Sequence, residues 1–128
     1  MNADNPSYWI VSAEDDIQTA NWLFKGGRYL HMAFFCHLVI EKSLKALIAK
    51  PGEIPPRIHN LMRLAELGGL EGSLSDEQLA ILNELFPMNL EARYPSEQFE
   101  MSHMMKESYC KSLLTRTEDL FKWIKSRL

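Results

Sequence analysis

The feature that most constrains this chain is an apolar stretch of helical length, FFCHLVIEKSLKALIAK, at residues 34–50. It is apolar around most of its circumference, yet it carries His37, Glu41 and Lys45 at i, i+4 and i+8. Successive helical residues are turned by about 100°, so these three side chains share one face with apolar neighbours. Helical patterns fill the rest of the chain and no alternating strand pattern occurs, which predicts a bundle built around this segment.

Local signals divide the chain into four main helices and one short helix. Asn5-Pro6 is typical of a helix start and Gly26-Gly27 of a helix end, which predicts a first helix over about residues 7–25. The second helix is expected over about residues 29–49, because Pro51-Gly52 follows it. A short helix is expected at about 58–67, and a capped one begins near Ser75 or Ser73 and is ended or kinked by Pro87. Residues 93–96 are expected as an irregular linker, with a last helix at about 100–127.

These elements predict an all-α protein. Short turns between long helices favour antiparallel neighbours, so we expect an antiparallel up-and-down bundle and a single domain over residues 1–128. Phe35, Val39 and Ala46 lie opposite His37 and Glu41 on the second helix. If both sides are covered this helix is central, and if one side is bare it contacts a partner subunit. We expect a homodimer.

Composition excludes several classes of protein. The 128 residues are 46% hydrophobic with a net charge of −3, which suits one core and argues against a globally basic nucleic-acid binder. The apolar stretch is too short to span a bilayer, and the first residues lack a secretion signal. Cys36 and Cys110 are expected as buried free thiols in a reducing compartment, so we expect a cytoplasmic protein without a membrane contact.

The polar line on the second helix has two interpretations. Glu41 and Lys45 form a structural i,i+4 ion pair at the edge of the bundle, or the line of His37, Glu41 and Lys45 faces a polar cleft. His59 likewise serves as a capping or loop residue, or it joins that cleft. His31 and His103 are expected to be exposed near helix ends. The sequence contains no metal-binding, phosphate-loop or GxSxG pattern, so neither metal nor cofactor is expected.

Several segments, taken in order from about Ala13 to the C-terminus, resemble the HEPN domain family, named for higher eukaryotes and prokaryotes nucleotide-binding. The segments that carry the resemblance are Ala13-x-x-Asp16-Ile17-x-x-Ala20, Glu41-Lys42-x-Leu44-Lys45-Ala46-Leu47, His59-Asn60-Leu61 and Ala92-Arg93-Tyr94-Pro95. The last segment resembles a branch of the family with an Arg-Tyr-Pro motif before the final helix.

The resemblance implies a compact bundle of helices, usually a homodimer. Many prokaryotic members are encoded beside a minimal nucleotidyltransferase and act with it as a toxin–antitoxin pair. Catalytically active members are metal-independent ribonucleases with an R-x4-6-H motif. No arginine here is followed by a histidine at that spacing, because Arg57 and His59 are too close and Arg93 and His103 too far apart. The departure from this motif argues against ribonuclease activity, and the function that remains is binding of a nucleotide or RNA.

Arg93 is a fixed cation suited to phosphate, and Tyr94 offers a ring for stacking. If His59 and the line of His37, Glu41 and Lys45 face the same groove, these six residues form a nucleotide or RNA phosphate site. In the structural alternative, Arg93 ties Glu41 or a helix C-terminus.

Two other functions stay open at this point. One is a ribonuclease toxin with a non-standard pair, Arg93 with His59 or His103. The other is a dimeric scaffold whose polar line is structural.

Overall fold

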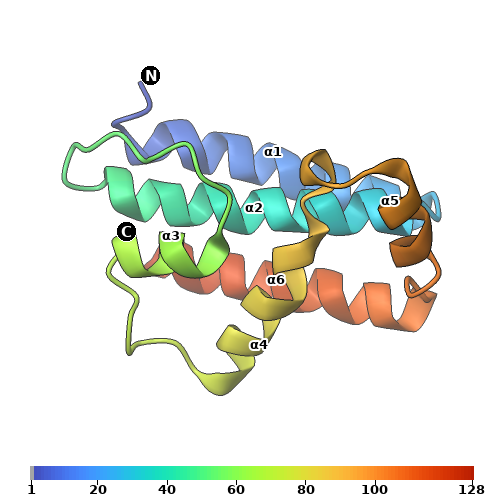
Figure 1. The fold of residues 1–128 in the computed structure, drawn as a ribbon. Coiled ribbons are helices and arrows are strands. Elements are labelled where there is room, and N and C mark those ends of the chain that lie inside the picture. Colours follow the sequence, from blue (N-terminus) through green and yellow to red (C-terminus); the bar gives the residue numbers. More distant parts are fainter. Residues whose placement is uncertain (1) are drawn as a thin grey trace.

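The computed structural model describes residues 2–128, and this part of the chain is all-helical, without a strand. The α-helices are α1 (Pro6–Lys25), α2 (Tyr29–Ala49), α3 (Leu61–Leu67), α4 (Asp76–Leu85), α5 (Pro95–Ser102) and α6 (Glu107–Ser126), and two 3-10 turns, η1 (Phe86–Met88) and η2 (Leu90–Ala92), follow α4. The long helices α1, α2 and α6 pack alongside one another, with the shorter helices around them (Figure 1). The predicted all-α bundle is confirmed.

The hairpin of α1 and α2 begins and turns where the sequence predicts. The Asn5 side chain accepts a hydrogen bond from the Ser7 backbone N–H, and Pro6 occupies the first turn. Gly27 has φ 72°, a left-handed conformation that favours glycine, so the chain reverses there. Between the helices, Lys42 Nζ contacts Asp16 Oδ2 at 2.6 Å and donates to the Ser12 hydroxyl at 2.7 Å.

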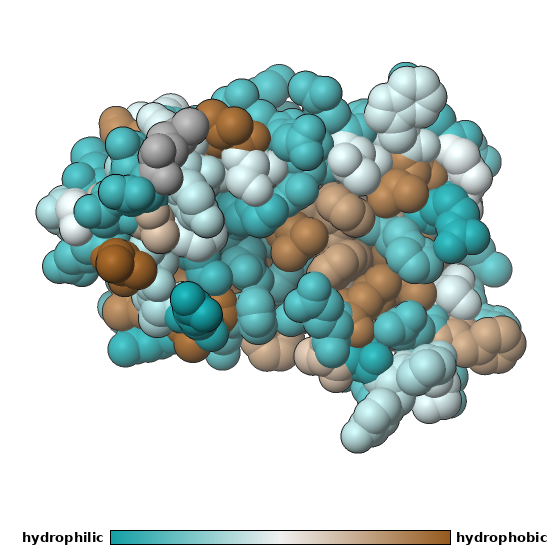
Figure 2. Space-filling view, turned by 90° about the horizontal axis from the view of Figure 1, so that it is seen from above, coloured by the Kyte–Doolittle hydropathy of each residue, from teal (hydrophilic) through white to brown (hydrophobic). Residues whose placement is uncertain are grey.

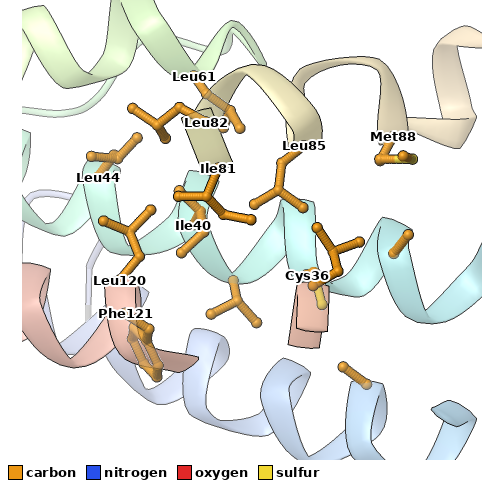
Figure 3. Packing of buried hydrophobic residues seen from close by; sticks show 14 of the residues in the cluster. Cys36, Ile40, Leu44, Leu61, Ile81, Leu82, Leu85, Met88, Leu120 and Phe121 are labelled. Carbon is orange, nitrogen blue, oxygen red and sulfur yellow. The ribbon is translucent and has the colours of Figure 1, made fainter. Parts of the chain in front are cut away.

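Helix α2 is the central element, because both of its sides are covered. Val39 and Ala46 are fully buried on one side and His37 on the other. In the core, Ile40 and Leu44 of α2 lie among side chains of α4 and α6 (Figure 3). The expected homodimer therefore cannot rest on a bare side of α2 and needs another surface.

The capped fourth helix is confirmed, and its cap is Ser75. The Ser75 hydroxyl accepts from the Gln78 N–H at 3.1 Å, and the Gln78 side chain accepts from the Ser75 N–H at 2.9 Å. This reciprocal pair is a capping box. The helix ends at Leu85, and Pro87 lies in η1, so the proline ends the helix.

Two predicted boundaries in the second half are wrong. Residues 93–96 are not an irregular linker throughout, because Pro95 opens α5, where its missing N–H costs nothing. The expected single helix over 100–127 is two helices, α5 and α6, separated at residues 103–106. The break carries neither glycine nor proline, so the local sequence contains no signal for it.

Helix α4 is fixed to α6 by one network of side chains. Arg116 Nη1 and Nη2 donate to the two Glu84 oxygens at 2.6 and 2.9 Å, and the Tyr109 hydroxyl donates to Glu84 at 3.0 Å. The hydrogen bond from Arg116 holds the pKa of Glu84 below its ordinary value. Burial, with the neighbouring Glu84, raises the pKa of Tyr109 to about 12. The network positions the turn η1, which follows α4 directly.

The cap of α4 generates a stability prediction. We expect Ser75→Ala to lower the free energy of unfolding by about 1 kcal/mol, because it leaves the Gln78 N–H without its side-chain acceptor. The matched control is Ser73→Ala, since the Ser73 hydroxyl makes no hydrogen bond within residues 2–128, and its loss should change stability by less than about 0.5 kcal/mol. Urea unfolding of the three proteins measures both changes. Equal effects of the two substitutions would contradict the assigned cap.

Candidate functional site

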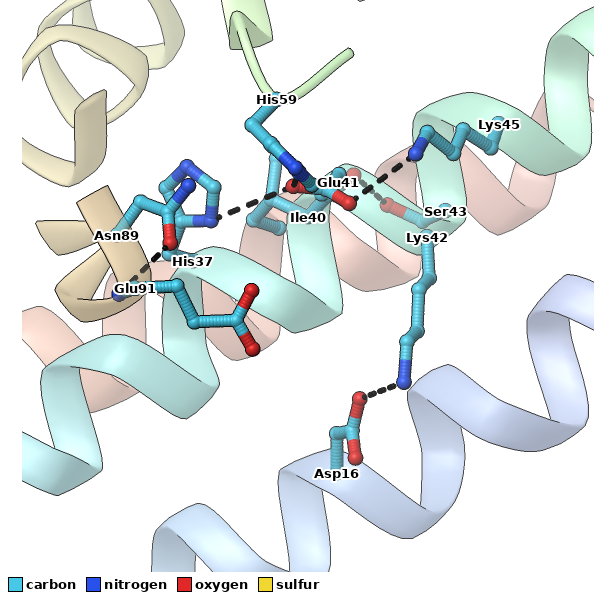
Figure 4. Close-up of polar contacts among 10 residues, drawn as sticks. All are labelled: Asp16, His37, Ile40, Glu41, Lys42, Ser43, Lys45, His59, Asn89 and Glu91. Carbon is cyan, nitrogen blue, oxygen red and sulfur yellow. Dashed lines mark hydrogen bonds and ion pairs between the residues drawn. The ribbon is translucent and has the colours of Figure 1, made fainter. Parts of the chain in front are cut away.

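The candidate site is organised by the Glu41 carboxylate of α2, which is only 5% exposed. Glu41 Oε2 accepts from Lys45 Nζ at 3.2 Å, and Glu41 Oε1 lies 2.9 Å from His59 Nδ1. His37 Nδ1 lies 3.7 Å from the same Oε1 atom (Figure 4). A buried carboxylate is costly unless it is paired and hydrogen-bonded, and these partners satisfy that need.

The predicted i,i+4 ion pair between Glu41 and Lys45 is present. It does not lie at the edge of the bundle, because Lys45 is buried. The residue is 5% exposed, and its ammonium group lies 5.4 Å from the centroid of the Trp9 ring of α1. The ring face attracts a cation and partly replaces its hydration. Lys45 therefore neutralises Glu41 inside the protein, next to α1.

His37 is fully buried, and neither ring nitrogen has a hydrogen-bond partner among residues 2–128. Burial lowers the pKa of the His37 imidazole below its ordinary value, and the nearby Glu41 carboxylate opposes that shift only in part. The neutral ring is therefore favoured at neutral pH. His37 lies behind the site and does not reach solvent.

His59 lies in the connection between α2 and α3, and its side chain is 53% exposed. It is not a helix cap: Asn60 has that role, and its side chain accepts from the Arg63 N–H at 3.1 Å. Because an ionised Glu41 only accepts hydrogen bonds, His59 Nδ1 carries the proton. The other nitrogen, Nε2, takes no part in this contact, and it donates or accepts according to the protonation of the ring.

Arg93 is held by the turn before it and by α5. Its Nε donates to the Pro87 carbonyl at 3.2 Å, and its Nη1 contacts Glu97 Oε2 at 3.2 Å. In the structural alternative Arg93 ties Glu41 or a helix C-terminus. Its contact with Glu41 is wrong, because the ion pair of Arg93 is with Glu97, whereas its Nε does donate to a carbonyl of the turn that follows the end of α4. The Nη2 group of Arg93 makes no hydrogen bond within residues 2–128.

His59 and Arg93 line one cleft of about 220 Å³, although they come from different connections of the fold. Both connections pass over the same flank of α2 (Figure 1). The other lining residues are Asn60, Phe86, Asn89 and Ala92.

The six predicted site residues fall into four groups around this cleft. His59 and Arg93 line it, whereas Glu41 lies behind His59 in direct contact with it. His37 and Lys45 surround Glu41 from inside the bundle. Tyr94 is 77% exposed and is not part of the lining.

Sequence reasoning missed Asn60, Phe86 and Asn89. Only Asn60 carried a signal, through its place in the His-Asn-Leu segment. Phe86 precedes Pro87 at the end of a helix, which indicates a boundary and no site.

Other candidate positions lie away from this cleft. His31 and His103 are exposed, as expected, and neither lines it. A larger cleft of about 290 Å³ follows α1, and His31 lines that one. Within residues 2–128, no group of three His, Cys, Asp or Glu side chains is arranged to hold a metal ion. Cys36 and Cys110 are buried and free, as predicted.

Comparisons with known proteins agree on the fold. A family model described as the HEPN domain matches residues 6–127. The crystal structure of an archaeal HEPN homologue is similar, with 21% sequence identity and a TM-score of 0.66, over 99% of this chain and 98% of that one. No curated protein gives a significant match to this sequence. None of the helices in residues 2–128 combines the length and apolar character that crossing a membrane requires.

The buried His37 generates a prediction for the pH dependence of stability. Because the pKa of His37 is lowered in the folded state, the unfolded chain binds a proton below about pH 6.5 that the folded chain does not. Acidification through that range should lower the free energy of unfolding, by at most about 1.4 kcal/mol per pH unit. We expect His37→Leu to flatten this dependence between about pH 7.5 and 5.5.

Urea unfolding at several pH values measures the effect. The control is His31→Gln, which changes an exposed histidine of the same helix and should leave the pH dependence as it is in the wild type. Parallel curves for the wild type and His37→Leu would show that His37 does not titrate differently in the two states.

Proposed function

The chain belongs to the HEPN domain family, and on that premise we propose that it is a binding module for the phosphate of a nucleotide or RNA. The observation that carries the proposal is the shared cleft of His59 and Arg93. A guanidinium with N–H groups left to donate binds phosphate oxygens, and a neighbouring imidazole adds a further hydrogen-bonding group. The pairing of His59 with Glu41 holds that imidazole in place.

The finer parts of the proposal concern partners. We propose a homodimer that acts in the cytoplasm with a minimal nucleotidyltransferase, as a toxin–antitoxin-like pair. The support for the transferase is family membership. The support for the dimer is apolar surface: hydrophobic side chains gather near the middle of one face, between hydrophilic ones (Figure 2). Trp22 of α1 and Phe99 of α5 are 73% and 67% exposed, respectively, and contact with a second copy would cover such side chains.

Substitution of Arg93 tests the binding proposal. We expect Arg93→Ala to weaken the affinity for AMP or a short single-stranded RNA about tenfold or more, because a charge-assisted hydrogen bond contributes about 1.5–3 kcal/mol. Arg93→Lys keeps the charge but lacks the planar guanidinium with its paired donors, so its affinity should lie between those of the wild type and Arg93→Ala. Arg57→Ala is the control, since Arg57 is exposed, close to His59 in sequence, and not part of the lining. Isothermal titration measures the affinities of the wild type and of the three variants, and thermal unfolding checks that each variant folds.

If neither AMP nor RNA binds the wild type, the phosphate site is excluded. The polar cluster around Glu41 would then have the scaffold role, in which Lys45→Met changes stability and leaves partner binding unchanged.

One observation favours a second candidate function, metal-independent cleavage of RNA. A general base needs an orienting partner, and His59 has Glu41 at 2.9 Å with Arg93 in the same cleft. Of the two pairs suggested by the sequence, Arg93 with His103 lacks this arrangement, since His103 Nδ1 contacts the Phe99 carbonyl and the ring lies outside the lining.

If the chain cleaves RNA, we expect cleavage in EDTA to persist, His59→Gln to abolish it, and Glu41→Gln to reduce it about tenfold or more. His103→Gln is the matched control and should cleave as the wild type does. Gel analysis of a labelled RNA measures the rates. RNA that stays intact after long incubation with the wild type would exclude this function and leave the binding proposal standing.

A further inference from the structure

The cleft contains an aromatic side chain that the binding proposal does not use. Phe86 lines it, and the residue is 47% exposed, whereas the preceding Leu85 is fully buried. Covering a water-exposed apolar ring with a flat apolar surface lowers the free energy of the system, because both surfaces leave water. The position of this ring is therefore informative about what enters the cleft.

The ring and the cation of the cleft are held by the same turn. Phe86 begins η1, and the carbonyl of the next residue, Pro87, accepts the hydrogen bond from Arg93 Nε at 3.2 Å. The turn follows α4, which Glu84 anchors to Arg116 of α6 through two hydrogen bonds. The guanidinium is thus tied to the backbone of the turn that carries the ring before any ligand arrives, which lowers the entropic cost of binding.

The remaining polar groups of the cleft are donors. Asn60 and Asn89 each use the side-chain oxygen within the protein, to accept from the Arg63 and Glu91 N–H groups at 3.1 and 3.2 Å, respectively. Their NH2 groups make no hydrogen bond within residues 2–128. No carboxylate is among the lining residues. The cleft therefore suits a ligand that is anionic, rich in acceptors and flat on one side.

We propose that the cleft binds one nucleotide unit, with its base stacked on Phe86 and its phosphate on Arg93, and that the Asn60 and Asn89 amides donate to acceptors on the base or ribose. The inference rests on the proposed function and specifies which part of the ligand each residue contacts. A free mononucleotide and an unpaired nucleotide of RNA share this chemistry. A phosphate without a base uses only Arg93 and His59.

The test compares ligands that differ only in the base. Wild-type protein is titrated calorimetrically with AMP, UMP, ribose 5-phosphate and a pentanucleotide RNA. We expect AMP to bind about fivefold or more tightly than ribose 5-phosphate, because a base stacked on an aromatic side chain contributes a gain of at least this size. UMP should retain part of that gain, since stacking tolerates any base.

Variants of Phe86 locate the effect. Phe86→Leu should reduce the ratio between AMP and ribose 5-phosphate to within about twofold and leave the ribose 5-phosphate affinity unchanged, because it removes only the stacking ring. Phe86→Trp keeps an aromatic face and should keep the ratio. Tyr8→Leu is the control, since it removes a similarly exposed aromatic ring outside the cleft. Thermal unfolding of each variant confirms that it is folded.

The outcomes separate this inference from the proposed function. If AMP and ribose 5-phosphate bind equally and Phe86→Leu changes neither, the base site is excluded while the phosphate site stands. If no ligand binds the wild type, both are excluded.

Sedimentation provides a further check. If Phe86→Leu converts a dimer into a monomer, the ring is an interface residue and the base site is overturned. A pentanucleotide that binds more tightly than AMP and loses affinity in Phe86→Leu supports the inference with RNA as the source of the nucleotide. If AMP and the pentanucleotide bind the wild type equally and both bind Phe86→Leu more weakly, the inference is supported with a free nucleotide as the ligand.

Discussion

The structure around the cleft depends on a single buried carboxylate. Glu41 lies on the central helix with little access to water, so its charge must be balanced within the protein. Lys45 of the same helix supplies the positive charge, and His59 of the following connection supplies a hydrogen bond. The second contact fixes part of a connection without regular structure against α2, and it orients the imidazole at the same time. His37, the third neighbour, is kept neutral by its burial.

The cleft is assembled from two connections that meet on one flank of α2. One brings His59, and the other, formed by the turns after α4, brings Phe86 and Arg93. The first is anchored by the hydrogen bond of His59 to the buried Glu41 carboxylate, and the second by the Pro87 carbonyl and by the network of α4 and α6. Binding residues on such connections are well placed when a rigid scaffold positions them. The cleft is open, its exposed lining is more apolar than polar, and no carboxylate is among its lining residues, which distinguishes it from the acidic surface expected from the net charge alone.

Binding and cleavage make different demands on the same groups. Binding requires that Arg93 has N–H groups left to donate and that the cleft admits a phosphate. Cleavage requires in addition that His59 accepts a proton from the attacking hydroxyl, and the pairing with Glu41 provides the orientation for that step. The R-x4-6-H spacing of active family members is absent, and in its place an arginine and a histidine from separate connections share an opening. Kinetic measurements on the wild type decide between the two functions.

By itself the sequence determined most of the helices, because periodicity and caps are local properties. It also showed that α2 is apolar enough to be the central helix, and its i,i+4 spacing indicated the pairing of Glu41 with Lys45. It did not contain the break between α5 and α6, where neither glycine nor proline marks the end. The proximity of His59 and Arg93 was a hypothesis that only the tertiary structure could decide, and so was the inclusion of Phe86 beside them. The physical reason is that the path of a connection is set by what it packs against and by which buried charge it must satisfy, and both belong to the folded molecule.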